Sequence, residues 1–367
     1  MKKVLVVAGK MYHGGLETMI MNFFRNLDRE QVMFDFLLHY EEPGEFDEEI
    51  KRLGGKIYIM PRPYPKNVFR YIRALNRFFK AHRGEYDIVH GHLTSVGAIY
   101  LTIARLHGVK TRAIHAHYTA TTGNHHQRLE RLMLFPLRAC ANFFFACSKK
   151  AGQFCFGKNI LTKSNYKTLH NGIDLKRFAF SRESREKMRR TFAIGPDCRV
   201  LLHVGRFEKQ KNHKKLIDIF AAFLNTHPDA VLLLVGEGSL KKETEEYAKS
   251  LGLGAVVRFL GVREDVDSVM QAADVFVMPS LYEGLPVAGV EAQAAGLPLV
   301  MADTVTEELN ILGNCVYVPL NAENSVWASE IAKFDTYVRE PVEQKMRDKG
   351  YDIVASAKWL EHFYLTH

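Results

Sequence analysis

The chain alternates short apolar runs with amphipathic segments from end to end, and this alternation limits its fold more than any other feature. The runs have the length and composition of buried strands, whereas the segments between them have helical periodicity. Such alternation indicates βαβ units, which build parallel sheets covered by helices. The runs of a first series are 3–7, 34–38, 56–59, 86–90, 111–115 and 143–147, and those of a second series are 199–204, 230–235, 256–260, 275–278 and 298–301.

The two series indicate an α/β protein with two Rossmann-like domains, for which 367 residues are sufficient. The segment between them, 178–198, is charged and helix-prone and contains Gly195-Pro196 near its end, so we interpret it as the interdomain connection. We therefore predict one domain over residues 1–178 and a second over residues 179–350.

Composition excludes several classes of protein. Hydrophobic residues make up 47% of the chain, which is too many for a disordered protein. No apolar run approaches the roughly 18 residues that span a bilayer, and the apolar stretch at the N-terminus is too short for a signal peptide. The five cysteines form no C-x-x-C pair, so reduced thiols in the cytoplasm are expected.

The net charge of +9 is unevenly distributed, since residues 51–180 hold 23 Lys and Arg against 4 Asp and Glu. Such asymmetry suggests an anionic partner. We find no nucleic-acid-binding motif and predict no nucleic acid partner. An anionic membrane surface is the other candidate, and it fits better with the family resemblance described below. The basic, amphipathic segment 66–80 has two open interpretations: a helix that lies on the bilayer, or a packed helix with a solvated basic face.

Two glutamates, Glu283 and Glu291, are the strongest candidates for ligand contacts. The first follows the predicted strand 273–279, and the second lies in a helix whose first turn contains Pro286. Both can reach the edge of the sheet at which α/β proteins bind ligands. Helix capping explains one such carboxylate but not a pair. Two carboxylates beside a helix N-terminus suit a ligand with an anionic part and several hydroxyls, such as a sugar nucleotide.

Cationic and glycine-rich loops supply the complementary chemistry. Arg206 and Lys211 follow a predicted strand and Gly205, where they could bind a diphosphate or simply form a basic surface turn. Gly14 and Gly15 precede a predicted helix, whose backbone N–H groups can meet an anion. The P-loop and dinucleotide-binding signatures are both absent from this loop.

These motifs together resemble the retaining glycosyltransferases of family 4, which have the GT-B fold. The resemblance rests on the E-x₇-E spacing with its Glu-Gly-Leu-Pro core and on Gly205-Arg206 followed by Lys211. It extends to Gly14-Gly15-Leu-Glu17, His115-Ala-His117, Ser148, Asn171-Gly-Ile-Asp174, Val235-Gly-Glu-Gly238 and Gly261. The stretches 114–117 and 291–298 particularly resemble the branch that builds bacterial exopolysaccharide and capsule.

The resemblance implies transfer of a sugar from a nucleotide-sugar donor, most commonly UDP-linked in this family, to a saccharide or lipid-linked acceptor with retention of configuration. It implies two Rossmann-like domains facing across a cleft, with 351–367 returning as a helix to the first domain. It also implies a cytoplasmic protein, with peripheral attachment to the inner face of the cell membrane as a further option. Rival interpretations are a sugar-nucleotide epimerase or hydrolase on the same fold, and a non-catalytic membrane-associated binding module.

The resemblance also implies roles for particular residues. Arg206 and Lys211 would hold the diphosphate, Glu291 the ribose hydroxyls and Glu283 the transferred sugar. His117 would face the donor sugar, with His115 as the alternative, and we expect the His115 side chain to point to the other face of the strand. The expected catalytic residues are Glu283, His117, Arg206 and Lys211, and the other expected donor-binding residues are Gly14, Gly15, Glu237, Val262, Gly284, Leu285 and Glu291.

The sequence predicts neither a bound metal nor a cofactor. His90-Gly-His92 and His115-Ala-His117 have the spacing of metal ligands, but alternating histidines at strand ends are more often hydrogen-bonded structural residues. By resemblance, the GT-B fold uses protein cations and backbone amides in place of a divalent cation.

Overall fold

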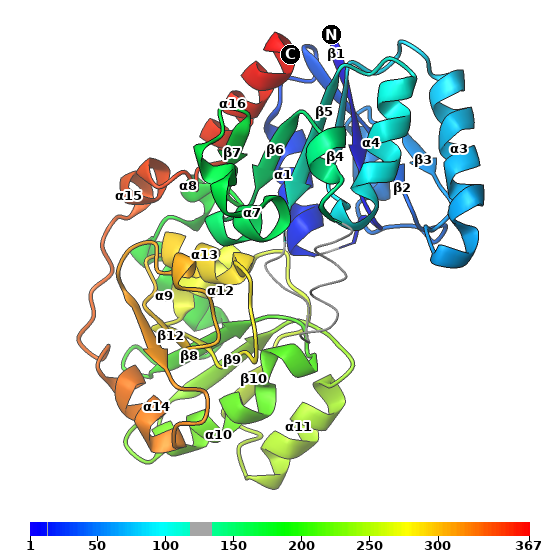
Figure 1. The fold of residues 1–367 in the computed structure, drawn as a ribbon. Helices are drawn as coiled ribbons and strands as arrows, with labels where there is room; N and C mark the ends of the chain where they lie inside the picture. The colour runs from blue at the N-terminus through cyan, green and yellow to red at the C-terminus, as the bar shows by residue number, and fades with distance from the viewer. Residues whose placement is uncertain (13, 118–133) are drawn as a thin grey trace. The chain divides into compact units, whose positions relative to one another are not determined.

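A computed structural model gives the fold and describes every residue except 13 and 118–133 (Figure 1). The chain forms two compact units. Unit 1 comprises residues 1–172 and 350–367, and unit 2 comprises residues 173–349. Each unit is a Rossmann-like domain with helices packed on a parallel sheet, as the alternating pattern predicted.

The sheet of unit 1 has seven parallel strands in the order β3-β2-β1-β4-β5-β6-β7. The strands are β1 (Lys2–Val7), β2 (Val32–Leu38), β3 (Ile57–Ile59), β4 (Ile88–Gly91), β5 (Thr111–Ala116), β6 (Phe143–Ala146) and β7 (Tyr166–Thr168). The helices are α1 (Gly15–Asn26), α2 (Asp47–Arg52), α3 (Val68–Ala81), α4 (Gly97–Leu106), α6 (Leu137–Cys140), α7 (Lys149–Phe156) and α16 (Ile353–Thr366). Three short 3₁₀ turns, η1 (Pro65–Asn67), η2 (Thr94–Val96) and η3 (Lys158–Thr162), complete the described elements of the unit.

Successive side chains of β1 are buried on opposite faces of this sheet, because neighbouring residues of a strand point in opposite directions. Val4 and Val6 belong to the core beneath α1 and α16, whereas Leu5 and Val7 belong to the core beneath α3 and α4. Asp352 caps the N-terminus of the helix α16, and its carboxylate accepts hydrogen bonds from two backbone N–H groups of the first turn. This helix packs against α1, β1 and β2, so the C-terminal segment completes the core of unit 1 (Figure 1).

The sheet of unit 2 has six parallel strands in the order β10-β9-β8-β11-β12-β13. The strands are β8 (Val200–Val204), β9 (Val231–Val235), β10 (Val257–Phe259), β11 (Val275–Met278), β12 (Leu299–Ala302) and β13 (Cys315–Val318). The helices are α8 (Leu175–Phe178), α9 (Arg182–Thr191), α10 (His213–Leu224), α11 (Lys241–Ser250), α12 (Val266–Ala272), α13 (Val287–Ala294), α14 (Asn324–Ala332) and α15 (Glu343–Asp348). The 3₁₀ turns are η4 (Lys209–Lys211) and η5 (Glu307–Leu309).

Two strands, β7 and β13, were absent from the sequence prediction. Both lie at the edge of a sheet. Most of their side chains are only partly buried. β7 has the sequence Tyr-Lys-Thr and carries no apolar run, whereas β13 is the short apolar run Cys-Val-Tyr-Val, which the sequence prediction did not include.

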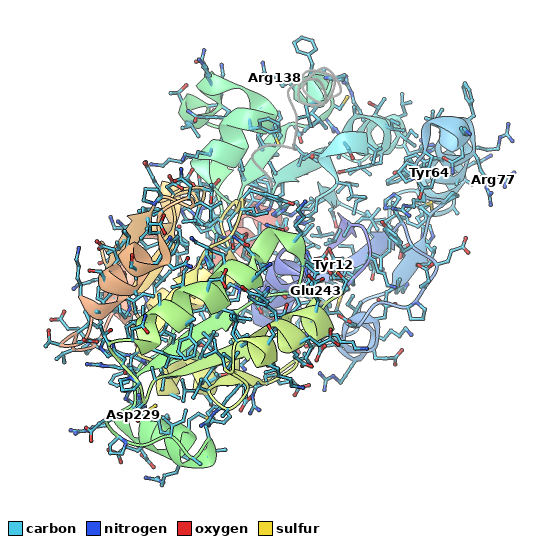
Figure 2. The ribbon with its side chains drawn as sticks, turned by 90° about the horizontal axis from the view of Figure 1, so that it is seen from below. Tyr12, Tyr64, Arg77, Arg138, Asp229 and Glu243 are labelled. Carbon is cyan, nitrogen blue, oxygen red and sulfur yellow. The ribbon has the colours of Figure 1, made fainter. Side chains whose placement is uncertain are left out.

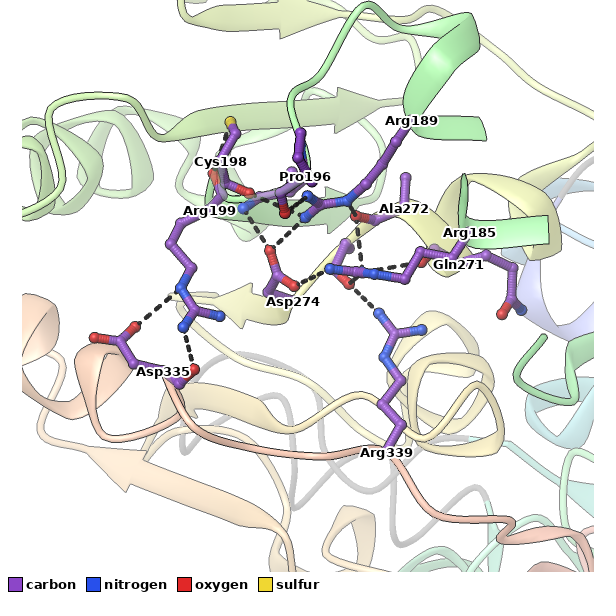
Figure 3. A network of polar contacts seen from close by, with 12 residues as sticks. Arg185, Arg189, Pro196, Cys198, Arg199, Gln271, Ala272, Asp274, Asp335 and Arg339 are labelled. Atoms are coloured by element: carbon purple, nitrogen blue, oxygen red, sulfur yellow. Dashed lines mark hydrogen bonds and ion pairs between the residues drawn. The ribbon is translucent and has the colours of Figure 1, made fainter. Parts of the chain in front are cut away.

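A buried polar network fastens the helix α9 to the start of β11 (Figure 3). The carboxylate of Asp274 pairs with Arg185 at 2.5 Å and with Arg189 at 2.8 Å, and it also accepts the backbone N–H of Val200. Arg339 donates to the carbonyl of Ala273 in the same network, and burial lowers the pKa of its guanidinium to about 9. The segment between the two predicted domains is therefore packed onto unit 2 by a carboxylate that satisfies two arginines.

Candidate functional site

Glu283 and Lys211 form a close ion pair beside the sheet of unit 2. The Lys211 Nζ lies 2.5 Å from Glu283 Oε1, and the two side chains are 16% and 6% exposed. Lys211 ends the turn η4 after β8, and Glu283 lies in the loop between β11 and α13. Because β8 and β11 are neighbouring parallel strands, their carboxyl ends bring these loops together.

Gln210 reinforces this pair and was missed by the sequence analysis. Its side-chain amide donates to Glu283 Oε2 at 3.2 Å and to the carbonyl of Tyr282 at 2.9 Å. Its backbone carbonyl accepts the N–H of Leu281 at 2.8 Å. Both carboxylate oxygens of Glu283 are thus held by consecutive residues of one turn. The only sequence signal for Gln210 is that it precedes a predicted cation.

The turn after β8 packs tightly against the turn after β9. Gly236 has φ +138°, and a Cβ there would lie 2.2 Å from the carbonyl oxygen of Gly205. Only glycine fits this close contact between backbones. The turn leaves Arg206 exposed, and its side chain has no hydrogen-bond or ion-pair partner among the residues that the structure describes. Its guanidinium can therefore bind an anion without breaking an existing contact.

Glu291 lies in the middle of α13, after the helix begins at Val287. Burial raises the pKa of its carboxyl group to about 7, against a smaller lowering effect of Arg177. Arg177 in turn pairs with Asp267 at 2.7 Å. Within the described part of the chain, the Glu291 carboxylate has no hydrogen-bond partner of its own, so it is available to hydroxyl groups of a ligand.

The other predicted donor contacts of unit 2 lie in loops. Glu237 follows β9, is half exposed and pairs with Lys241 at 2.5 Å. Val262 follows β10 and is 67% exposed. Gly284 and Leu285 are partly buried in the loop that leads to α13.

In unit 1, the loop after β1 ends at the N-terminus of α1. Gly14 is the N-terminal cap residue of α1, and a Cβ there would lie 2.4 Å from the carboxylate of Glu17. Gly15 is the first residue of the helix. The structure thus places both glycines at a helix N-terminus, where backbone N–H groups are open to an anion.

The histidines of unit 1 correct one expectation. His115 does not point away from His117, because residues two apart in a strand face the same side. Their rings stack with centroids 4.2 Å apart. His115 is fully buried, whereas His117 is partly exposed and its Nε2 lies 2.9 Å from His92 Nδ1. Burial, with a smaller contribution from His90, lowers the pKa of the His117 imidazole to about 3.

Comparison with known proteins defines the class. The family model described as "Glycosyltransferase Family 4" matches residues 13–177, and the model described as "Glycosyl transferases group 1" matches residues 184–327. The fold and these matches define a GT-B glycosyltransferase. The "Putative glycosyltransferase EpsF" of Bacillus subtilis is 37% identical over 358 residues, covering 96% of this chain and 93% of that protein. The chain therefore belongs to glycosyltransferase family 4, as its motifs predicted.

More distant proteins share the full length of the chain. An Escherichia coli protein named UDP-Gal:alpha-D-GlcNAc-diphosphoundecaprenol alpha-1,3-galactosyltransferase is 25% identical over 371 residues, with coverage of 96% and 93%. Among solved structures, Anabaena HepE in complex with UDP is similar with a TM-score of 0.80 at 18% identity, and each chain is covered completely. WaaG, a glycosyltransferase involved in lipopolysaccharide biosynthesis, has a TM-score of 0.69 at 17% identity with 99% of each chain covered. These structural likenesses show the shared fold.

The described helices include none with the length and apolar character that crossing a bilayer requires.

Proposed function

We propose that this glycosyltransferase moves a sugar from a UDP-linked donor to a saccharide or lipid-linked acceptor with retention of the anomeric configuration. The observation that carries the proposal is the Lys211–Glu283 pair, held by Gln210 beside the exposed Arg206. This arrangement offers positive charge for a diphosphate and a fixed carboxylate for a sugar within adjacent loops of one domain.

The proposed chemistry uses these charges in one displacement. The bond between the anomeric carbon and the donor phosphate oxygen breaks while the bond to the acceptor oxygen forms on the same face. The acceptor hydroxyl proton passes to the leaving phosphate. Arg206 and Lys211 stabilise the negative charge that develops on the diphosphate, and the carboxylate of Glu283 favours the oxocarbenium-like charge on the sugar. His117 is proposed to face the sugar, and transfer is proposed to need neither a divalent cation nor a cofactor.

The choice of a UDP-sugar is supported by relatives. HepE was solved with UDP and with UDP-glucose, and the name of the Escherichia coli relative specifies UDP-Gal as donor. Glu291 is proposed to bind the ribose hydroxyls, because its carboxylate is open to a ligand. The other proposed donor contacts are Gly14, Gly15, Glu237, Val262, Gly284 and Leu285.

The basic half of the chain supports a site of action at the inner face of the cell membrane. One side of α3 buries Tyr71, Leu75, Phe78 and Phe79, so this helix is a packed element of unit 1. Its other side exposes Phe69 together with Arg70, Arg73, Arg77 and Lys80, and Figure 2 shows Arg77 projecting outward. An apolar ring among cations suits an anionic lipid surface. We propose a peripheral cytoplasmic enzyme of exopolysaccharide, capsule or related glycan synthesis. The name of the Escherichia coli relative, which specifies a diphosphoundecaprenol-linked sugar, supports a role in glycan synthesis.

A donor screen followed by product analysis tests the proposal. Nucleotide sugars that bind the native chain raise its melting temperature, and the best donor is then incubated with and without lipid-linked saccharide acceptors. A transferase makes a glycosylated product only with acceptor, and NMR of the new linkage reports its configuration. Conversion of the donor without acceptor would support an epimerase or hydrolase instead. Binding to anionic vesicles without any donor-dependent product would support the non-catalytic module.

A further inference from the structure

Four histidines, His90, His92, His115 and His117, lie close together where β4 and β5 end in unit 1. In the parallel register, His90 lies opposite Ala113, so the next residues on the same face, His92 and His115, are also neighbours. The ring centroids of His90 and His92 are 4.5 Å apart, and those of His92 and His115 are 5.3 Å apart. These three side chains are 2%, 6% and 0% exposed. Such a concentration of buried imidazoles is unusual for a purely structural strand end, where each ring ordinarily finds a polar partner.

Several nitrogens of this cluster lack such a partner. His90 Nδ1 lies 2.5 Å from the hydroxyl group of Tyr364 on α16, but His90 Nε2 is buried without a hydrogen bond. Neither ring nitrogen of His115 has a hydrogen bond of normal geometry. The backbone of Leu169 is close enough to raise the pKa of that imidazole slightly, against the larger lowering effect of burial. A buried polar atom without a partner is costly, and an unfilled ligand site is one explanation.

We propose that His90, His92 and His115 bind one divalent transition-metal ion, with Zn²⁺ as the best match. One nitrogen from each ring lies within 4.8 Å of the other two, and among the described His, Cys, Asp and Glu residues no other set of three or more meets that condition. Tetrahedral Zn–N bonds of about 2.0–2.1 Å bring ligand nitrogens to roughly 3.3 Å from one another. The rings of His90 and His115 are now stacked with an interplanar angle of 9°, whereas an ion must lie in the plane of each ligand ring. Binding would therefore require the rings to turn about their side-chain bonds until the three nitrogens converge on the ion. Three neutral imidazoles suit Zn²⁺, Co²⁺, Ni²⁺ or Cu²⁺ and disfavour Mg²⁺ and Ca²⁺.

The surroundings already orient two of the rings in the way that metal sites require. The Tyr364 hydroxyl group holds His90 at Nδ1, which leaves Nε2 for an ion. His117 Nε2 lies 2.9 Å from His92 Nδ1, so Nε2 of His92 is the nitrogen left for an ion. Such outer contacts fix the tautomer and direction of a metal-binding histidine. The ion would join β4 to β5 and, through Tyr364, to α16. It would be structural, so this proposal does not depend on the proposed transfer reaction.

The test measures metal binding by the full-length chain after chelation and removal of any affinity tag. Co²⁺ and Zn²⁺ are titrated separately, with calorimetry for the stoichiometry and visible absorption for the coordination of Co²⁺. We expect one ion per chain, a tetrahedral Co²⁺ spectrum and a raised melting temperature. His115→Asn should weaken binding at least about tenfold, on the scale of losses at metal sites. His362→Asn is the matched control, because His362 is exposed on α16 and lies outside the cluster.

A measurement on the native chain guards against variants that fail to fold. Addition of Zn²⁺ should shift the ring-nitrogen NMR signals of His90, His92 and His115 while leaving that of His362 in place. The chain has 16 histidines, so adventitious binding is the natural competitor. The proposal would be overturned if His115→Asn left metal binding unchanged, or if the native chain bound no stoichiometric metal. The cluster would then be a stack of neutral imidazoles without a metal ion.

Discussion

Replacement of Glu283 by glutamine is the most direct test of the proposed chemistry. The substitution keeps the shape of the side chain and removes one charge. Lys211, only 16% exposed, then loses its counter-ion. Removing one partner of a buried pair costs about 3–5 kcal/mol of folding stability, and breaking a surface pair costs about 0.2–1 kcal/mol. With exposures of 16% and 6%, the pair lies nearer to the buried limit. We therefore expect a loss of about 2–3 kcal/mol.

The effect on catalysis should exceed the effect on binding. A charge that acts on the transition state is worth about 2.7–4 kcal/mol, which corresponds to a fall in kcat of about 10²–10³-fold. A glutamine amide still contacts sugar hydroxyls in the ground state, so donor affinity should change by less than about fivefold. Initial rates over a range of donor concentrations separate the two parameters, and urea denaturation measures the stability.

Glu330→Gln is the matched control, because it neutralises a glutamate that pairs with Lys333 on the surface of the same unit. It should leave both rate and stability nearly unchanged. The double variant with Lys211→Met should recover part of the lost stability, since it removes the unpaired ammonium group. If Glu283→Gln folds and keeps kcat within about threefold of the native value, a transition-state role for this carboxylate is refuted.

Three further substitutions test other parts of the structure. Arg206→Ala should lower kcat/KM by about 10²–10³-fold and weaken binding of free UDP measured by calorimetry, without a change in melting temperature because the side chain is exposed; unchanged UDP affinity would contradict its contact with the diphosphate. Burial raises the pKa of Glu291 to about 7, so between about pH 4.5 and 7 the native chain binds more protons than the unfolded chain and its stability falls as pH rises. Glu291→Gln should remove this decline in the free energy of unfolding, which is worth about 1–3 kcal/mol. Urea denaturation at pH 5 and pH 8 measures it, and an equal difference in unfolding free energy between mutant and native chain at both pH values would contradict the reasoning. Asp274→Asn should destabilise unit 2 by about 3–5 kcal/mol, because Arg185 and Arg189 lose their shared carboxylate; a drop in melting temperature no larger than that of the exposed Asp348→Asn would speak against this network.

The sequence predicted most of the fold because the buried strands carry continuous apolar runs, which read clearly without tertiary information. It missed β7, which has only three residues and no apolar run, and β13, a short apolar run at the edge of its sheet. It predicted Glu283 and Lys211 as separate contacts, but not their pairing across 72 positions of sequence. Gln210 was not predicted, because a single uncharged amide side chain in a loop belongs to no charge pattern or helical or strand periodicity. The predicted direction of the His115 side chain was wrong, because residues two apart in a strand face the same side of the sheet.

Sheet topology explains why the site residues occur where they do in the sequence. In unit 2 the strand order changes direction between β8 and β11, and in unit 1 it does so between β1 and β4. At such a point the two following connections run to opposite faces, which opens a crevice at the carboxyl ends of the strands. Lys211 and Glu283 follow β8 and β11, whereas Gly14 and His92 follow β1 and β4. Residues separated by about 70 positions or more can thus share one crevice in each domain, so a short motif spacing such as that of Glu283 and Glu291 describes only half of the unit 2 site. The other half lies in the turn η4 after the neighbouring strand β8, which contains Gln210 and Lys211.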